Sequence, residues 1–494
     1  MTYLLALDQG TTSSRAILFT PEGRPVALAQ RGFTQHYPRP GWVEHDPLEL
    51  WESQLWAAQE ALRRAGVGAG EVAALGIANQ RETTLVWERG TGRPLHPAIV
   101  WQDRRTAPLC QALRERGLEG VFRERTGLLL DPYFSATKLL WLLENVPGLK
   151  EKGERGEALF GTVDTWLLYR LTGGQVHATD PTNASRTLLF NLHTGSWDEE
   201  LLGLLGIPRA MLPEVRPSDG AFGETLPELL GAPIPIRGVL GDQQAALLGQ
   251  GGLEAGAAKC TYGTGAFLLL HTGERPVLPP QGLLATPAYA PRGGRAYALE
   301  GSVFVAGAAV GWLEEVGLLG KGEAEALAGQ VEDAGGVYFV PAFTGLGAPY
   351  WDPYARGGIL GLTRGTTRAH LVRAALEGVA FSVGEVVRAM AEAAGLALGA
   401  LKADGGMAGN DLFLQIQADL LGVPVLRPGV TETTALGAAW AAGVGVGLLA
   451  PEDLKGLWRE AARFSPRMPE AKREARYRGW RRAVDRVRGW AEEG

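Results

Sequence analysis

A short turn near the start of the chain has the residue types of a phosphate-binding turn. An apolar run, residues 3–7, leads to Asp8, and small, mostly hydroxylated residues follow before Arg15. Backbone N–H groups that converge at such a turn can hold phosphate oxygens, and an arginine adds a fixed positive charge. Asp8, at the end of the strand, is placed to hold Mg²⁺ through water. The alternative is an ordinary hairpin turn that Asp8 caps.

A second turn of this kind lies in the other half of the chain. Gly263, Thr264 and Gly265 separate the strand-like residues 260–262 from the apolar residues 266–270. Taken alone it is better explained as a plain hairpin, and it gains weight as the second such turn, one in each half. The sequence contains neither G-x-x-x-x-G-K-[ST] nor G-x-G-x-x-G, so P-loop and dinucleotide folds have no support.

A carboxylate and an arginine–glutamate pair follow other strand-like runs. Asp242 comes directly after residues 239–241, and a carboxylate at such a strand end, facing a crevice, can accept a hydroxyl proton. Arg81 and Glu82 follow residues 75–78 and offer a forked donor beside an acceptor, which suits a small polyol. Two alternatives stay open, namely that Asp242 caps the next helix and that Arg81 and Glu82 form a surface ion pair of little energetic weight.

Aromatic residues near strand ends could form the walls of such a site. Trp101 opens the segment W-Q-D-R-R-T, and Tyr133 and Phe267 follow further along the chain. Their rings would cover the carbon backbone of a small ligand and exclude water. In such positions, however, aromatic residues more often belong simply to the core.

The elements that must position these residues fall into two halves of similar architecture. Residues 3–33 read as a three-stranded meander, and a helix follows with Asp46 as its N-cap. Strand, turn and strand return near residues 260–270, and the glycine-rich residues 249–252 read as a hinge. We therefore predict an α/β protein of two domains, residues 1–248 and residues 249–494.

Composition limits the partners and the compartment. Apolar residues make up 46% of the 494 residues, and the net charge of −6 gives no reason to expect a nucleic acid or an anionic membrane as partner. The two cysteines lie far apart, which predicts no disulfide framework and a reducing compartment. The first residues do not resemble a signal peptide, and the uncharged residues 433–450 are too short to span a membrane. We predict a cytoplasmic protein with no stable membrane anchor, in which residues 433–450 form a packed internal helix and a loop.

The C-terminal segment from residue 470 is basic and has a helical apolar face. That face carries Tyr477, Trp480, Val484, Val487 and Trp490. A membrane-surface helix would have such a pattern. We favour instead a terminal helix that packs on its own domain.

Together these segments resemble the FGGY carbohydrate kinases from residue 3 to about residue 490. Y-F-S-A-T-K-L-L-W-L-L-E-N at residues 133–145 is similar to the family's first signature, and residues 357–377 contain one similar to the second. N-Q-R-E-T and W-Q-D-R-R-T resemble the segments of members that act on glycerol rather than on a pentulose or gluconate. The resemblance implies two actin/Hsp70-like (ribonuclease H-like) ATPase domains, each a mixed sheet flanked by helices, that close over Mg·ATP in the cleft between them.

The resemblance also implies an activity and residue roles. The activity is ATP-dependent phosphorylation of glycerol to sn-glycerol 3-phosphate, the first step of glycerol catabolism, by a homo-oligomer that is a dimer or a tetramer. The catalytic residues would be Asp242, as general base, with Asp8 and Arg15, and both carboxylates would hold Mg²⁺. Glycerol would be bound by Arg81, Glu82, Trp101, Tyr133, Asp242, Gln243 and Phe267. ATP or ADP would be bound by Thr11, Thr12, Ser13, Arg15, Thr264, Gly307, Gly311, Met407 and Asp411.

Several positions depart from the family pattern. Gly311 stands where many members carry Gln, and Asp411 where many carry Asn, which puts the nucleotide contacts there in question. The Gly-Gly-Thr-Arg loop that resembles an allosteric fructose 1,6-bisphosphate site is absent, and residues 232–234 take its place. The phosphorylatable histidine of some members is replaced near residues 218–222. We therefore predict weak or absent control by either route.

Two other functions remain open. An FGGY kinase for a pentulose or a sugar acid would need more room at Trp101 and Phe267. An ATP-driven binding or scaffold protein, as in the actin and Hsp70 branches of the fold, is a different class. Such a protein would have no use for the polar set of Arg81, Glu82 and Asp242.

Overall fold

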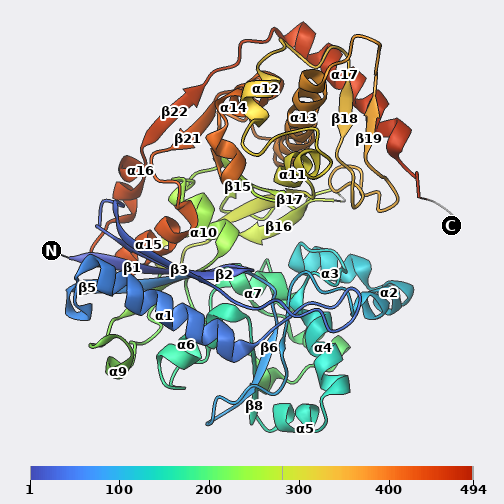
Figure 1. The fold of residues 1–494 in the computed structure, drawn as a ribbon. Helices are drawn as coiled ribbons and strands as arrows, with labels where there is room; N and C mark the ends of the chain where they lie inside the picture. Colours follow the sequence, from blue (N-terminus) through green and yellow to red (C-terminus); the bar gives the residue numbers. More distant parts are fainter. Residues whose placement is uncertain (1, 281, 492–494) are drawn as a thin grey trace.

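The chain folds into two α/β lobes that lie one above the other in Figure 1. The computed structural model describes residues 2–280 and 282–491. The first lobe is built on a five-stranded mixed sheet in the order β13-β5-β1-β2-β3, and the second on a seven-stranded sheet in the order β16-β17-β15-β14-β20-β21-β22. These two mixed sheets, each flanked by helices, confirm the predicted α/β class.

The strands of the two large sheets have the following bounds. In the first sheet they are β1 (Tyr3–Gln9), β2 (Ser13–Phe19), β3 (Pro25–Gly32), β5 (Val72–Asn79) and β13 (Ile236–Gly241). In the second they are β14 (Ala258–Tyr262), β15 (Ala266–Gly273), β16 (Leu284–Pro287), β17 (Tyr297–Val303), β20 (Leu401–Asp404), β21 (Val425–Pro428) and β22 (Glu460–Phe464). Two-stranded ladders join β4 (Glu44–His45) to β7 (Ala98–Ile99), β6 (Leu85–Glu88) to β8 (Ala158–Gly161), β9 (Ala178–Thr179) to β12 (Glu214–Val215), β10 (Phe190–Asn191) to β11 (Ser196–Trp197) and β18 (Tyr338–Val340) to β19 (Gly358–Leu360).

The helices surround these sheets. Those before the second sheet are α1 (Pro47–Ala65), α2 (Ala107–Glu115), α3 (Glu119–Thr126), α4 (Ser135–Asn145), α5 (Leu149–Glu154), α6 (Val163–Leu171), α7 (Pro181–Ala184), α8 (Glu199–Leu205), α9 (Pro227–Leu230) and α10 (Asp242–Gly249). The helices that follow β17 in the chain are α11 (Gly307–Glu315), α12 (Ala324–Ala328), α13 (Arg368–Ala394), α14 (Asp411–Leu421), α15 (Thr433–Gly445), α16 (Leu454–Leu457) and α17 (Glu470–Val487). The predicted N-cap of α1 is confirmed, because the Asp46 side chain accepts a hydrogen bond from the Leu48 N–H.

The first sheet is buried on both faces because its strands alternate between two apolar layers. Leu5 and Leu7 of β1 point to the layer that contains α1, whereas Leu4 and Ala6 point to the layer that contains α15. Helix α15 comes from the second half of the sequence, yet it packs on β1, β5 and β13 of the first sheet and on α10. The domain boundary between residues 248 and 249 stays a prediction. Helix α15 lies after this boundary in the sequence but packs on the first sheet.

Glycines let α15 approach its neighbours at backbone contact. A Cβ atom on Gly437 would lie 1.8 Å from the Ala245 carbonyl oxygen of α10, and one on Gly249 would lie 1.9 Å from the Thr433 carbonyl oxygen. A Cβ on Gly76 of β5 would lie 2.1 Å from the Ala438 carbonyl oxygen. The uncharged stretch predicted as a packed internal helix is thus confirmed over Thr433–Gly445.

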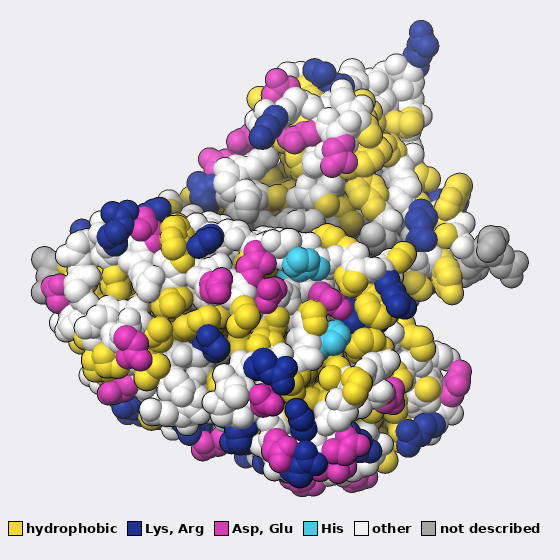
Figure 2. Space-filling model, turned by 60° about the horizontal axis from the view of Figure 1, so that its bottom comes forward, with side chains coloured by type: hydrophobic (Ala, Val, Ile, Leu, Met, Phe, Trp, Pro, Cys, Tyr) yellow, Lys and Arg dark blue, Asp and Glu magenta, His cyan; other side chains and the backbone are white. Residues whose placement is uncertain are grey.

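The C-terminal helix packs on its own lobe, as predicted. On α17 the side chains of Tyr477, Trp480, Val484 and Val487 are buried, and Trp480 stacks on Phe381 of α13. The prediction for Trp490 is wrong, because α17 ends at Val487 and the Trp490 side chain is 70% exposed. No helix in residues 2–280 or 282–491 is long and apolar enough to cross a membrane. On the face shown in Figure 2, basic and acidic side chains are interspersed.

The helix contact gives a stability prediction. Gly437→Ala should destabilise the protein by at least about 2 kcal/mol, because the added methyl group collides with backbone and forces α10 and α15 apart. The apparent melting temperature, measured by circular dichroism, should fall by at least about 2 °C. Gly203→Ala is the matched control, since residue 203 is also helical and its added Cβ meets no atom within 4 Å. It should leave the melting temperature unchanged or higher, and equal effects of the two substitutions would contradict this account of the helix contact.

Candidate active site between the two lobes

The polar residues predicted from the sequence gather where three parallel strands end. Gln9 of β1 and Gly241 of β13 both pair with Asn79, the last residue of β5. Because the carboxyl ends of parallel strands meet at one edge of a sheet, the turn after β1, the residues after β5 and the start of α10 come together. The Nε atom of Arg81 lies 3.3 Å from Oδ1 of Asp242. Arg81 and Asp242, both of which we predict to bind the substrate, therefore lie side by side.

Asp242 lies in the first turn of α10 rather than at its cap. Gly241 is the N-cap residue, so the alternative that Asp242 serves as the helix cap is wrong. Its side chain is 31% exposed, and Oδ1 accepts a hydrogen bond from the Gln243 N–H. Burial raises the pKa of Asp242, while the cations of Arg81 and Lys259 oppose this rise. The result is a carboxylate that is open to a ligand on one side and held by a guanidinium on the other.

The first turn presents its arginine between two carboxylates. Arg15 donates to Oδ2 of Asp8 at 2.8 Å and to Oε2 of Glu432 at 2.6 Å. Asp8 is buried, which raises its pKa, and the Arg15 cation opposes that rise. Glu432 lies directly before α15, so the last part of the chain helps to fix the charge at this turn.

The first turn contacts Trp101 through the hydroxyl of Thr11. The turn closes by a hydrogen bond from the Gly10 N–H to the Ser13 carbonyl, and the Thr12 carbonyl accepts from the Phe33 N–H. The Thr11 hydroxyl accepts a hydrogen bond of 2.9 Å from Nε1 of Trp101. Trp101 is thereby fixed to the turn that we predict to hold phosphate.

The Tyr133 ring and the Phe267 backbone are linked to this region from different lobes. The Trp101 and Tyr133 rings meet edge to face, with centroids 5.6 Å apart. Phe267 lies on β15 of the second sheet, and its carbonyl accepts a hydrogen bond from Nζ of Lys259. The same Nζ donates to Oε1 of Gln243, so the buried Lys259 links Gln243 of the first half to Phe267 of the second.

Four buried charged side chains form a ring beneath Asp242. Glu82 accepts from Nε of Arg186 at 2.6 Å, and Glu300 accepts from Nη2 of Arg186 at 3.1 Å. Glu300 also accepts two hydrogen bonds from Arg81, at 2.6 and 2.8 Å. All four side chains are at most 3% exposed. Burial alone would raise the pKa of Glu300, but the two arginines hold it at about 2.

The buried ring rules out a surface ion pair of Arg81 and Glu82, and it adds Arg186 and Glu300 to the candidate site. Arg81 and Glu82 are buried, so they are not a surface ion pair. No sequence motif points to Arg186 or Glu300. The available signal for Glu300 is a single acid in the apolar strand A-L-E-G-S-V. Glu82 has the left-handed backbone angle φ of 64°, which is strained for a residue with a side chain and occurs often at functional sites.

A layer of buried amides and carboxylates supports the end of β5. Asn79 donates to Oδ1 of Asn183 at 2.9 Å, and Asn183 donates to Oδ1 of Asp180 at 2.9 Å. Asp164 lies in the same layer and accepts a hydrogen bond of 2.6 Å from the Thr179 hydroxyl. Burial, together with the nearby Asp180, raises the pKa of Asp164 to about 7.

The second turn brings Thr264 and Gly307 together, and their role in holding a nucleotide stays a prediction. The Thr264 carbonyl accepts from the Ala306 N–H at 2.8 Å, and the Gly307 N–H donates to the Gly263 carbonyl at 2.9 Å. A Cβ on residue 307 would lie 2.7 Å from that carbonyl oxygen, which explains the glycine at the start of α11. A Cβ on Gly311, one turn later, would meet no atom within 4 Å. The site therefore has open space where many family members carry a longer side chain.

The residues predicted for the adenosine end follow β20. Met407 lies in a short 3₁₀ helix, Gly406–Gly409, and Asn410 caps α14 by accepting from the Phe413 N–H. Asp411 forms an ion pair of 2.7 Å with Arg427. The arginine neutralises the charge that distinguishes Asp411 from the Asn of many family members. Their contacts with a nucleotide stay a prediction.

The acidic residues fit a nucleotide-bound magnesium ion better than a resident metal. Within residues 2–280 and 282–491, no group of three or more His, Cys, Asp or Glu residues could hold a metal ion. Mg²⁺ that arrives with a nucleotide needs only one or two carboxylates, because phosphates and waters complete its shell. Asp8 and Asp242 suit this role, because β1 and β13 end at the same edge of the sheet, where both pair with β5.

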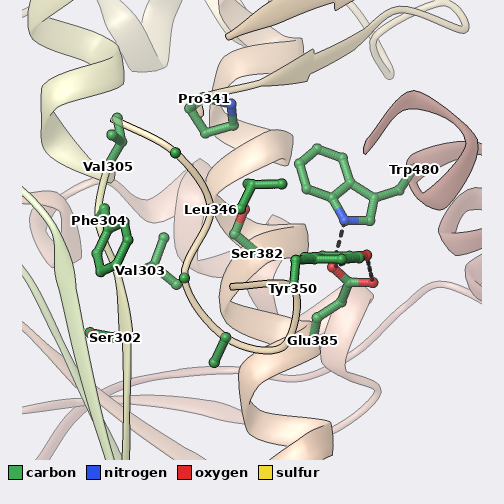
Figure 3. Close-up of a pocket in the computed structure, with 13 residues that line it drawn as sticks. Ser302, Val303, Phe304, Val305, Pro341, Leu346, Tyr350, Ser382, Glu385 and Trp480 are labelled. Atoms are coloured by element: carbon green, nitrogen blue, oxygen red, sulfur yellow. Dashed lines mark hydrogen bonds between the residues drawn. The ribbon is translucent and has the colours of Figure 1, made fainter. Parts of the chain in front are cut away.

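A separate cavity in the second lobe is too small for a substrate (Figure 3). Its volume of about 20 Å³ holds at most one water molecule. Glu385 of α13 accepts hydrogen bonds from Nε1 of Trp480 at 2.9 Å and from the Tyr350 hydroxyl at 2.8 Å. These bonds fasten the loop that contains Tyr350 to α13 and α17, and they give the cavity a structural role.

Comparisons with known proteins agree over the whole chain. The family models for the N-terminal and C-terminal domains of the FGGY family of carbohydrate kinases match residues 3–249 and 258–446. A glycerol kinase of Thermus brockianus is 81% identical, with 100% of both chains covered, and one of Citrifermentans bemidjiense is 59% identical, with 99% of both covered. The crystal structure of Plasmodium falciparum glycerol kinase with ADP has a TM-score of 0.94 and 38% identity, and covers 99% of this chain and 98% of that one. The predicted actin/Hsp70-like fold is thereby confirmed.

The buried layer gives a prediction of pH-dependent stability. Asp164 binds its proton more tightly in the folded protein than in the unfolded chain, so its stabilising effect is present at low pH and is lost as the pH rises through about 7. Relative to the wild type, Asp164→Asn should therefore gain about 2–3 kcal/mol in unfolding free energy between pH 5 and pH 8, measured by urea denaturation.

Asp198→Asn serves as the control. Hydrogen bonds and Arg125 outweigh burial and lower the pKa of Asp198, so its ionisation is complete below pH 5. Its difference from the wild type should not change over this range. A constant difference for Asp164→Asn as well would contradict the assignment of Asp164 as a protonated buried acid.

Proposed function

The chain belongs to the FGGY family of carbohydrate kinases, and we propose from this premise that it transfers the γ-phosphoryl group of ATP to glycerol, producing sn-glycerol 3-phosphate. The observation that carries the proposal is the convergence of Arg81, Glu82 and the partly open Asp242. The Tyr133 ring lies over Arg186, the partner of Glu82, and meets the Trp101 ring edge to face. A triol needs donors and acceptors in close alternation around its hydroxyls and apolar cover for its carbons. The glycerol kinases at 81% and 59% identity support the same substrate.

Asp242 is the group we assign to proton transfer. Phosphoryl transfer to an alcohol needs a base for the hydroxyl proton and otherwise little covalent chemistry. The carboxylate is 31% exposed, and the Arg81 Nε atom 3.3 Å away stabilises its ionised form until the proton arrives. Oδ2 is the atom that we expect to accept the proton, because Oδ1 already accepts a hydrogen bond from the Gln243 N–H.

The two turns supply the opposite side of the site. Arg15 offers a fixed charge to the transferring phosphoryl group, and the backbone around Thr11, Thr12 and Ser13 offers N–H donors. The turn that contains Thr264 joins β14 to β15, two inner strands of the second sheet, and with Gly307 it would hold the nucleotide phosphates. Mg²⁺, held by Asp8 and Asp242, would neutralise charge on the phosphate oxygens when it is bound.

The aromatic wall favours glycerol over a five-carbon sugar. Trp101 is held by its hydrogen bond to Thr11 and by the edge of Tyr133, so it cannot swing aside without breaking both contacts. A pentulose or sugar acid needs that space. A scaffold role is disfavoured because four buried charges around an open carboxylate suit a small polar ligand.

Location, assembly and regulation complete the proposal. We propose a cytoplasmic homo-oligomer, and the free, buried state of both cysteines supports a reducing compartment. Weak or absent control by fructose 1,6-bisphosphate or by histidine phosphorylation stays a prediction. Strong inhibition by the bisphosphate at sub-millimolar concentration would contradict it.

Turnover tests the substrate. Release of ADP from Mg·ATP should depend on glycerol, and the phosphorylated product should be sn-glycerol 3-phosphate. Xylulose, ribulose and gluconate should give rates at least about 10²-fold lower in kcat/KM, because they do not fit behind Trp101. Turnover with a ketose but not with glycerol would refute the substrate assignment, and ADP release without any acceptor would favour an ATP-driven binding protein.

Replacing the base tests the mechanism. Asp242→Asn keeps the shape of the side chain but removes the proton acceptor, so kcat should fall by about 10²–10⁴ with little change in the KM for glycerol. Asp219→Asn is the control, because Asp219 is also buried and accepts its hydrogen bonds from Tyr289 and Arg292 rather than from site residues. Its kcat should match the wild type. Near-normal kcat in Asp242→Asn would show that another group takes the proton.

A further inference from the structure

We infer that Glu300 and Arg186 are positioning residues for glycerol, which hold Arg81 and Glu82 so that one chosen edge of each faces the substrate. The inference rests on the proposed function and adds two residues to it. Neither side chain offers glycerol a free polar atom. Both Glu300 oxygens accept hydrogen bonds from arginines, Nε and Nη2 of Arg186 donate to glutamates, and Nη1 of Arg186 is fully enclosed. Their effect on the reaction must pass through the two side chains that they hold.

Counting donors on Arg81 shows which edge remains for a ligand. A guanidinium has five N–H groups. Glu300 accepts one from Nη1 and one from Nη2, and Oε1 of Gln244 lies 3.2 Å from Nη1 and accepts the other. The Nε hydrogen and one Nη2 hydrogen remain, and both lie on the edge where Asp242 is 3.3 Å from Nε. Glu300 therefore orients Arg81 so that its free edge, which can donate to two neighbouring hydroxyls, lies beside Asp242.

The two carboxylate oxygens of Glu82 also differ in their contacts. Its Oε1 accepts from Nε of Arg186 and lies 3.8 Å from Nε of Arg81. In the part of the chain that the structure describes, Oε2 accepts no hydrogen bond, and it is not fully enclosed by other atoms. Arg186 thus occupies one carboxylate oxygen and leaves the other accessible as an acceptor.

The ring also joins glycerol binding to the second lobe. Glu300 lies on β17, where it pairs with Leu269 of β15 and Leu284 of β16. Arg81, Glu82 and Arg186 all come from the first half of the chain. The orientation of Arg81 therefore depends on how the second sheet is seated against the first lobe.

Stability alone is a poor reason for this ring. The cost of removing charges from water offsets much of the attraction between buried ions, so such pairs add little net stability compared with apolar side chains. A fixed direction of hydrogen bonding is what apolar residues could not supply. Positioning is the role that the geometry favours.

Glu300→Gln tests the inference. The amide keeps the size of the side chain but replaces one acceptor oxygen with a donor, so the Arg81 fork loses its bidentate partner. The KM for glycerol should rise about 10²-fold, while the KM for ATP should change less than about threefold. The double variant Arg81→Gln with Glu300→Gln should have the same KM for glycerol as Arg81→Gln alone, because Glu300 acts through Arg81.

Glu377→Gln is the matched control. Glu377 of α13 is also a glutamate at 1% exposure that pairs with two arginines, Arg373 at 3.1 Å and Arg476. It lies outside the candidate site, so its loss should lower the melting temperature and leave the KM for glycerol unchanged. If Glu300→Gln fails to fold, Glu300→Asp replaces it, because the shorter acid keeps the charge but cannot reach both Arg81 nitrogens.

The outcomes separate this inference from the proposed function. A folded Glu300 variant with the wild-type KM for glycerol overturns the inference, as do effects of Glu300→Gln and Arg81→Gln that add independently. Both results leave the proposed function intact, provided that the wild type turns over glycerol. Absence of glycerol-dependent ADP release by the wild type would overturn the proposed function instead.

Discussion

The rest of the site depends on one constraint, which is the burial of two arginines and two glutamates between the lobes. Each charge loses water on folding and must find opposite charge in its place. The alternation of Arg81, Glu300, Arg186 and Glu82 meets that requirement within hydrogen-bond distance. It also decides where the unused donors and acceptors point, so the edge of the ring beside Asp242 is where a polyol can bind.

Backbone packing brings the ring to the right place. Parallel strands end together at Gln9, Asn79 and Gly241, and α10 begins with Asp242 at that edge. The glycine contacts between α10 and α15 hold the helix at backbone distance, and Glu432 before α15 reaches Arg15. The last third of the chain thus supports a site whose residues are encoded mostly in the first half.

Local features of the sequence were predictable, and long-range pairings were not. The meander from Tyr3, the Asp46 cap and the α15 helix follow from apolar patterning, turn residues and capping chemistry. Asp8, Arg81 and Asp242 stand out because each is polar at the end of an apolar run. Glu300 and Arg186 show no such local pattern, since their partners are more than 100 residues away in sequence. The error at Trp490 arose from extending a helical period past the residue where the helix ends.

A crystal structure with glycerol bound tests the central claim most directly. The account predicts one terminal hydroxyl within hydrogen-bond distance of Asp242, with neighbouring hydroxyls on the Nε edge of Arg81 and on the free oxygen of Glu82. Glu300 should keep both of its bonds to Arg81 in that complex. Glycerol bound elsewhere, or bound here with Glu300 released from Arg81, would contradict the claim that the buried ring orients the substrate.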